Sequence, residues 1–197
     1  IGYASNNSSG VPANFRNYFV MTFDKPFIDT STWNEEGIQS STFELKSDRV
    51  GAIIGFDLER GESINISIAS SYISHKQAEL NLKEIGNKDF EQIKQQAKQI
   101  WEKELGRIRI KPVNYVQNKT FYSALYRMLI FPRKFYEIND KGEIVHYSPY
   151  NGTIEKGYMY ADNGFWDTFR AQFPFLNLMY PSIVTEILKS LENVYKE

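Results

Sequence analysis

The sequence predicts an α+β protein, because the repeat of its apolar residues changes part-way along its 197 residues. Between positions 18 and 71 apolar and polar residues alternate, which is typical of antiparallel strands with one buried side. After Ser74 apolar residues recur every three or four positions, as they do in amphipathic helices. The chain is 42% hydrophobic and 15% aromatic, which is enough for a packed core.

Four strands are expected in the first region, 1–74, which we interpret as the C-terminal part of an antiparallel β-sandwich domain. The clearest strand contains Ile64, Ile66 and Ile68, which would share one face while serine and asparagine occupy the other. A turn at 59–62 would connect it to the strand before it. The other three strands are expected at 18–24, 42–46 and 50–58.

Two helices are expected in the second region, 75–112. The first would end at Gly86, and the second would start at Asp89, because Gln92 follows at the capping-box spacing. Gly106 closes the second helix. We interpret this helix as a linker that packs one domain on the other, through a single apolar stripe formed by Phe90, Ile93, Ala97, Ile100, Trp101 and Leu105.

The third region, 113–197, is expected to begin a helical domain. A helix from about position 118 ends at Pro132, and its apolar stripe contains Phe121, Ala124, Leu125, Met128 and Leu129. The long connection after it contains a hairpin over 138–144 and is a place where function is often found. Two more helices are expected, one over 165–180 with a kink or break at Pro174 and one from about 182 onward.

Composition and spacing exclude several kinds of function. A net charge of -1 gives no basic surface for nucleic acid, and there are no cysteines for disulfides or thiolate metal sites. No apolar run approaches the roughly 20 residues that span a bilayer. His75 and His146 are too isolated for a zinc helix or a Ser-His-Asp triad, and His146 is interpreted as a solvated strand residue. Glu35, Glu36 and Asp162 have no specific partner in the pattern. The Asn-x-Ser/Thr matches are interpreted as chance occurrences at Asn6, Asn7, Asn65, Asn118 and Asn151.

The candidate site is the group Trp166, Asp167 and Arg170. An indole face, a carboxylate and a guanidinium within five residues suit a sugar, whose C–H face packs on the ring while its hydroxyls meet the charged groups. The structural alternative is a surface ion pair between Asp167 and Arg170 at i and i+3, beside a core tryptophan.

The stretch around this group resembles the signature region of the family 92 glycoside hydrolases. The resemblance rests first on Gly157-Tyr158-Met159-Tyr160 and on Trp166-Asp167-Thr168-Phe169-Arg170, followed by Pro174 and Pro181. Further matches follow the same order along the chain: Tyr18-Phe19-Val20, Lys25-Pro26-Phe27, Val50-Gly51-Ala52, Trp101, Leu105-Gly106-Arg107-Ile108 and Phe121-Tyr122-Ser123-Ala124-Leu125-Tyr126-Arg127.

The resemblance implies a calcium-dependent, inverting exo-α-mannosidase that removes mannose, with α-1,2 linkages expected, from glycans outside the cytoplasm: periplasmic, cell-surface or secreted. It implies that the helices begin an (alpha/alpha)6 toroid. The family's acid, base and calcium ligands would lie beyond residue 197, so no catalytic residue and no metal ligand is assigned here. Trp166, Asp167 and Arg170 would hold the sugar, and Phe169 replaces a frequent tyrosine.

Two other functions stay open. A non-catalytic carbohydrate-binding module could use the tyrosines at positions 147, 150, 158 and 160, and a structural helical adaptor would bind no sugar. The chain starts at Ile1 and ends inside a helical pattern without a glycine or asparagine cap. We therefore expect it to be a fragment of a longer protein, and we expect the fragment alone to be inactive.

Overall fold

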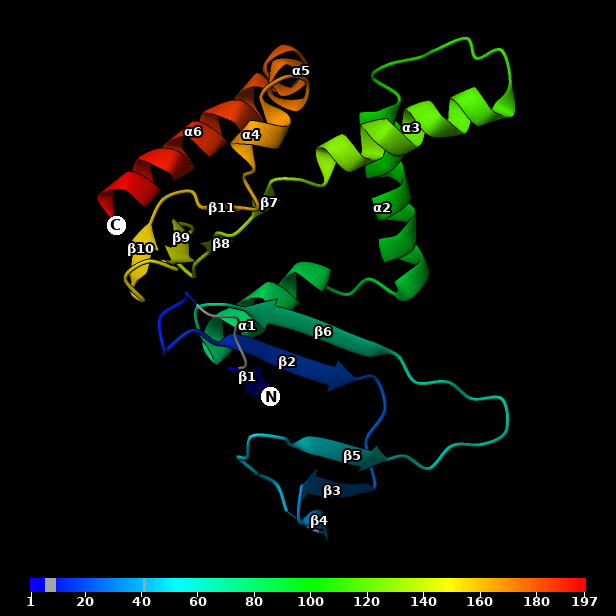
Figure 1. The fold of residues 1–197 in the computed structure, drawn as a ribbon. Helices are drawn as coiled ribbons and strands as arrows, with labels where there is room; N and C mark the ends of the chain where they lie inside the picture. Colours follow the sequence, from blue (N-terminus) through cyan, green and yellow to red (C-terminus); the bar gives the residue numbers. More distant parts are fainter. Residues whose placement is uncertain (6–9, 41) are drawn as a thin grey trace. The chain divides into compact units, whose positions relative to one another are not determined.

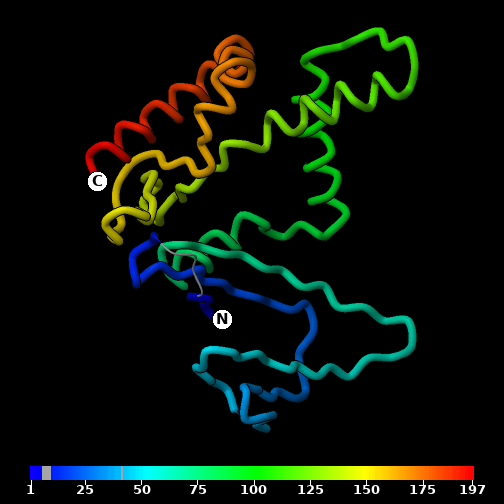
Figure 2. Tube along the Cα trace, viewed as in Figure 1, coloured from blue at the N-terminus to red at the C-terminus, as the bar shows by residue number. Residues whose placement is uncertain are grey.

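The computed structural model describes residues 1–5, 10–40 and 42–197, and the chain divides into two compact units (Figure 1, Figure 2). One unit comprises Ile1–Val20 and Ala69–Glu197, and the other comprises Met21–Ile68. The α+β class is confirmed, since helices and small antiparallel sheets alternate along the chain. Two of the Asn-x-Ser/Thr matches, at Asn6 and Asn7, lie outside the described residues.

The second unit contains a three-stranded sheet in the order β4-β3-β5. Its strands are β3 (Asp29–Asn34), β4 (Gly37–Ser40) and β5 (Gly51–Gly55), and both pairings are antiparallel. The strand predicted at 42–46 is wrong, because both edges of the central strand β3 are already paired with β4 and β5. The prediction missed both β3 and β4, which are joined by a tight turn.

Gly51 shows why this sheet needs a residue without a side chain. It lies opposite Trp33 in the β3–β5 pairing, and a Cβ atom at this position would overlap the indole ring. The Trp33 ring thus lies directly over the glycine backbone. This packing explains the glycine of the Val50-Gly51-Ala52 motif.

A second sheet has the order β1-β2-β6, with β1 at Gly2–Ala4, β2 at Asn17–Phe23 and β6 at Ile66–Ser71. Two of these strands were predicted to within about two residues. The expectation that the isoleucine face is buried is wrong for the described residues, because Ile66 is 53% and Ile68 is 57% exposed. The described part of the chain supplies no apolar layer that covers them.

The next helices begin and end where the sequence predicts. In α1 (His75–Leu82) the Ser74 hydroxyl accepts from the Gln77 backbone N–H, and a short 3-10 turn, η1 (Lys83–Ile85), ends at Gly86 with φ +61°. Helix α2 (Phe90–Leu105) has the predicted capping box, since Asp89 Oδ1 accepts from the Gln92 N–H at 2.8 Å and the reciprocal bond is 3.0 Å.

The apolar stripe of α2 is largely exposed in the described residues. Phe90 is 67% and Ile100 is 61% exposed, and α2 has no buried residue. Near its C-terminal end α2 meets α3 (Tyr115–Leu129), where the rings of Trp101 and Tyr126 lie 4.6 Å apart. Helix α3 begins a few residues earlier than predicted, because the Asn114 side chain caps it.

The long connection after α3 is an ordered set of short strands. A sheet of order β10-β9-β8 is formed by β8 (Glu137–Ile138), β9 (Ile144–Tyr147) and β10 (Ile154–Lys156). The predicted hairpin is confirmed between β8 and β9, and its Gly142 has φ +78°. The prediction missed β10 and the pair formed by β7 (Arg133–Lys134) and β11 (Tyr160–Ala161).

The last three helices are α4 (Phe165–Thr168), α5 (Gln172–Met179) and α6 (Pro181–Lys196). The predicted break at Pro174 is wrong, since the helix is interrupted at 169–171 instead. Pro174 is the third residue of α5, where a backbone N–H has no intrahelical partner and proline costs little. Figure 1 shows α5 beside α6, and their core contains Leu176, Tyr180, Val184, Leu129, Phe175, Met179 and Ile183.

Candidate functional site

The predicted site residues lie on and just after α4, a single helical turn. The Gly164 carbonyl accepts from the Asp167 and Thr168 N–H groups, each at 3.1 Å, and from the Thr168 hydroxyl at 2.8 Å. The Phe169 N–H closes the turn on the Phe165 carbonyl at 3.0 Å. The threonine of the motif therefore holds the turn together, while the side chains on either side of it stay free for other contacts.

Trp166 is an exposed residue in this structure. Its side chain is 75% exposed, and Asp167 and Arg170 are exposed beside it. The interpretation of Trp166 as a core residue is therefore wrong for the described chain. An exposed indole of this size, with charged neighbours on the same turn, is what a stacking surface for a ligand requires.

Arg170 is held by aromatic rings instead of by Asp167. Its guanidinium carbon lies 5.7 Å from the centroid of the Trp166 ring and 5.2 Å from that of Phe169. Within the described ranges no ion pair joins Asp167 to Arg170, so the surface-ion-pair interpretation is also wrong. Both the carboxylate and the guanidinium thus remain available to a ligand.

The α4 turn packs against the helix that follows it, α5. The Phe165 ring stacks on Phe173 of α5, with centroids 5.1 Å apart and planes at 18°. Gln172, at the start of α5, donates to the Met128 carbonyl at 2.9 Å and to the Phe131 carbonyl at 2.6 Å. The end of α3 and the start of α5 are therefore joined directly behind the candidate site.

Two tyrosines donate hydrogen bonds to one carboxylate, and one of these tyrosines lies in the segment that precedes α4. Tyr160 donates to Glu186 Oε2 at 2.6 Å, and Tyr136 donates to the same oxygen at 3.1 Å. Burial, together with the neighbouring Glu186, raises the pKa of Tyr160 well above its usual range, so its hydroxyl stays a neutral donor. Sequence analysis missed this contact, because Tyr136, Tyr160 and Glu186 are far apart in the chain.

His146 is not the solvated strand residue that the sequence suggested. It is fully buried on β9, the central strand of its sheet. Its Nδ1 lies 2.9 Å from the Gly157 carbonyl and its Nε2 lies 2.9 Å from Glu197 Oε1. Both edges of β9 are paired, with β8 and β10. The imidazole is enclosed by the chain at Gly157 and by the end of α6.

Two carboxylates that were expected to lack a partner have one. Asp162 pairs with the Arg133 guanidinium, which raises the pKa of Arg133. Asp162 also has φ +65°, an uncommon conformation for a residue with a side chain. Glu35 lies 3.7 Å from Arg49 in an exposed pair. The Asp162–Arg133 pair connects β11 to β7 close to the candidate site.

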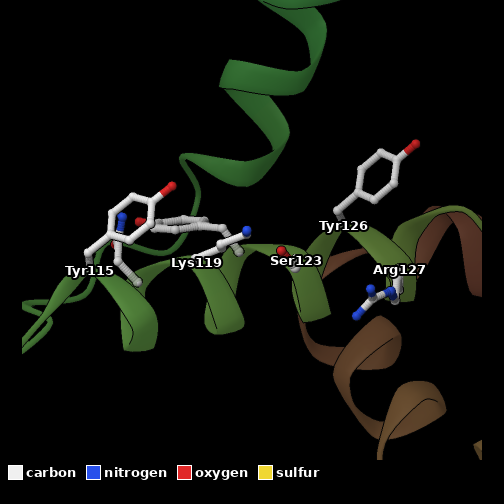
Figure 3. Close-up of a pocket in the computed structure, with 7 residues that line it drawn as sticks. Tyr115, Lys119, Ser123, Tyr126 and Arg127 are labelled. Atoms are coloured by element: carbon white, nitrogen blue, oxygen red, sulfur yellow. The ribbon is translucent and has the colours of Figure 1, made fainter.

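A hollow with a volume of about 460 Å³ lies along α3 (Figure 3). None of Trp166, Asp167 and Arg170 lines it, so it is separate from the α4 turn. The residues that line it are Tyr115, Asn118, Lys119, Tyr122, Ser123, Tyr126 and Arg127. Four of these belong to the 121–127 motif, so this motif forms much of the lining of the hollow.

Two stretches of the chain match the domains of one known protein family. The N-terminal domain of glycosyl hydrolase family 92 matches residues 1–71, and the catalytic domain of the same family matches residues 77–197. The chain belongs to glycosyl hydrolase family 92. The candidate site on α4 lies within the part that matches the catalytic domain.

Solved family 92 structures have the same fold over this stretch. An inverting mannosidase of Bacteroides thetaiotaomicron VPI-5482 is 42% identical, with a TM-score of 0.94, and the match covers 99% of this chain and 27% of that one. An α-mannosidase of the same species is 25% identical, with a TM-score of 0.75, and the match covers 89% and 24%. A third family 92 hydrolase, ccman5, is 22% identical, with a TM-score of 0.78, and the match covers 90% and 23%, which supports the fold alone. A comparison with curated proteins gave no match.

The chain thus spans about a quarter of the length of these solved relatives. Among residues 1–5, 10–40 and 42–197 no three His, Asp or Glu side chains come together as a metal site. We assign none of the described residues as a ligand of the calcium ion that the family resemblance implies. In the same residues no helix has the length and apolarity needed to cross a membrane.

Proposed function

We propose that this chain is part of an inverting, exo-acting α-mannosidase that removes α-linked mannose, α-1,2 in the first instance, from glycans. The observation that carries the proposal is the 42% identity, over 99% of this chain, to an inverting mannosidase of the same family. The exposed group on α4 adds support, because its side chains are those that a sugar requires and they are exposed in the described chain.

Each of the three residues has a distinct role in the proposed complex. The Trp166 indole packs against the C–H face of the mannose ring. The Asp167 carboxylate accepts hydrogen bonds from two sugar hydroxyls, and Arg170 donates to a third oxygen from its position over the indole. These contacts orient the ring, and orientation is itself a large part of catalysis.

The chemical step needs groups that we place in the rest of the enzyme. An inverting glycosidase uses one carboxylic acid to protonate the leaving oxygen and a second carboxylate to activate water, roughly 6.5–9.5 Å apart. We place both, together with the calcium ligands, outside residues 1–197. When bound, calcium would supply an electrophilic grip on the sugar hydroxyls.

The same proposal accounts for the uncovered apolar faces. We propose that the sheets belong to a β-sandwich and that α3 to α6 begin an (alpha/alpha)6 toroid. The remaining strands and helices would then cover Ile66 and Ile68 of β6 and Phe90 and Ile100 of α2, which are 53–67% exposed here. We also propose a periplasmic, cell-surface or secreted enzyme, since its glycan substrates lie there.

The alternative of a binding module is less well supported by the structure. It relied on a surface of tyrosines at positions 147, 150, 158 and 160. Tyr147 is 3% exposed and Tyr160 is 6% exposed, and both hydroxyls are used inside the protein. Of that surface, the exposed Tyr150 and the half-buried Tyr158 remain.

We expect residues 1–197 alone to release no mannose from α-1,2-mannobiose, whereas the complete enzyme releases it. The reason is that the acid and base lie elsewhere. Mannose is measured by chromatography over a dilution series, and a calcium chelator added to the complete enzyme is expected to stop release until calcium is restored. Turnover by the short chain would contradict this division of the active site. Inactivity of the complete enzyme on α-1,2-, α-1,3- and α-1,4-mannobiose would contradict the proposed function itself.

A further inference from the structure

One side of α6 carries an unexpected row of polar residues. Glu186, Ser190 and Asn193 follow one another at i, i+4 and i+7, so they lie along a single face of the helix. Ser190 is fully buried on this otherwise apolar side, next to Ile187. We call these three residues the α6 clamp.

Each clamp residue bonds to the segment that leads to the candidate site. The Ser190 hydroxyl accepts from the Tyr160 backbone N–H at 2.8 Å, and Asn193 donates to the Tyr158 carbonyl at 2.9 Å. Glu186 accepts from the Tyr160 hydroxyl at 2.6 Å. The segment 158–160 is thus bonded at two backbone groups and one side chain along two turns of one helix.

The opposite side of this segment is also fixed. Phe135 donates its N–H to the Met159 carbonyl at 2.8 Å, and β11 pairs with β7 from Tyr160 onward. Met159 is 2% exposed and Tyr160 is 6% exposed, so this part of the segment is enclosed. Because buried backbone groups that lose a partner are costly, the segment has little freedom to move along α6.

Gly157 shows how closely the segment approaches the clamp. It has φ +110°, and a Cβ atom there would lie 2.6 Å from the Asn193 side-chain nitrogen. Any other residue would therefore be strained and would push Asn193 away. The glycine of the 157–160 motif is explained by this contact with α6, and Tyr160 is explained by its hydrogen bond to Glu186.

We propose that the α6 clamp is a positioning device that sets the place of Trp166 and Asp167. The proposal rests on the proposed function, in which these two residues hold the sugar. Only five residues separate Tyr160 from Trp166, and Asp162 is bonded to Arg133 between them. A shift of the segment along α6 would therefore be passed to the α4 turn. Misplacement of a binding group by about 1 Å can cost roughly a hundred-fold in rate.

The test uses Ser190→Ala and Asn193→Ala in the complete enzyme, with kcat and KM measured separately on an α-1,2-mannoside. Each variant is expected to lower kcat/KM by at least about ten-fold, mainly through kcat. Val184→Ala, on the same helix but in the α5–α6 core, is the control for lost stability, and the exposed Glu192→Gln is the control for an unrelated change on α6. The comparison is made between variants that lose the same amount of melting temperature. If a clamp variant then loses no more kcat/KM than Val184→Ala does, the proposal is overturned.

A double-mutant cycle separates this proposal from the proposed function. In a background that carries both Trp166→Ala and Asp167→Asn, Ser190→Ala is expected to cost less than about two-fold, because both residues that it positions are already impaired. Losses that simply multiply overturn the positioning role while leaving the sugar-binding role of Asp167 intact. If Asp167→Asn alone retains normal efficiency, the proposed role of the α4 turn is wrong and the clamp proposal falls with it.

Discussion

Asp167→Asn in the complete enzyme should lower kcat/KM by about ten-fold to more than a hundred-fold, which corresponds to roughly 1.5–3 kcal/mol for a hydrogen bond to a charged group. As positive charge develops on the sugar ring, a carboxylate that accepts from its hydroxyls binds more strongly, and an amide does not. We therefore expect kcat to fall along with affinity. Steady-state kinetics on α-1,2-mannobiose measure both.

The melting temperature of the same variant should hardly change. Asp167 is exposed in the structure, and the described residues give it no ion pair to lose. Asp140→Asn is a matched control, because Asp140 is an exposed carboxylate in the β8–β9 turn whose partner is Lys76 of α1. Normal efficiency in Asp167→Asn, or an equal loss in both variants, would contradict a specific role for Asp167.

Leu176→Ala should lower the free energy of unfolding by about 2–5 kcal/mol, since a large buried side chain is replaced by a cavity. Leu176 is 2% exposed in the core between α5 and α6. Leu178→Ala, two residues along the same helix at a 79% exposed leucine, should change it by less than about 0.5 kcal/mol. Urea unfolding of the two variants measures the difference, and equal losses would contradict this packing.

Local signals in the sequence predicted the elements that depend on neighbouring residues. The capping box at Asp89 and Gln92, the left-handed glycine at Gly86 and the hairpin around Gly142 were all confirmed. Each of these is decided within about four residues of chain by hydrogen bonds or backbone geometry. Such signals do not depend on what packs against the element.

Features set by distant residues could not be read in the same way. Strands β7 and β11 are only two residues long, and they exist because they pair with each other. The burial of His146 depends on Gly157 and on the end of α6. The break between α4 and α5 also differs from the prediction, because proline in a first turn leaves a helix intact.

The sequence indicated the three side chains of the candidate site, but it did not indicate the α6 residues that bond to the segment before it. Trp166, Asp167 and Arg170 stood out because three complementary groups occur within one turn. The clamp residues left a weaker signal, namely Ser190 and Asn193 near the apolar residues Ile187 and Val194 of the same helix. Polar residues at i, i+4 and i+7 on a buried helical face are the pattern that would have identified them.

The most direct test of the whole account is proton NMR of mannose as the complete enzyme releases it from an α-1,2-mannoside. An inverting hydrolysis, with water attacking opposite the leaving group, predicts that the β-anomer of mannose appears first and that the α-anomer follows only by mutarotation. The same first product should form, more slowly, with Asp167→Asn. Early appearance of the α-anomer, or no release of mannose at all, would contradict the account.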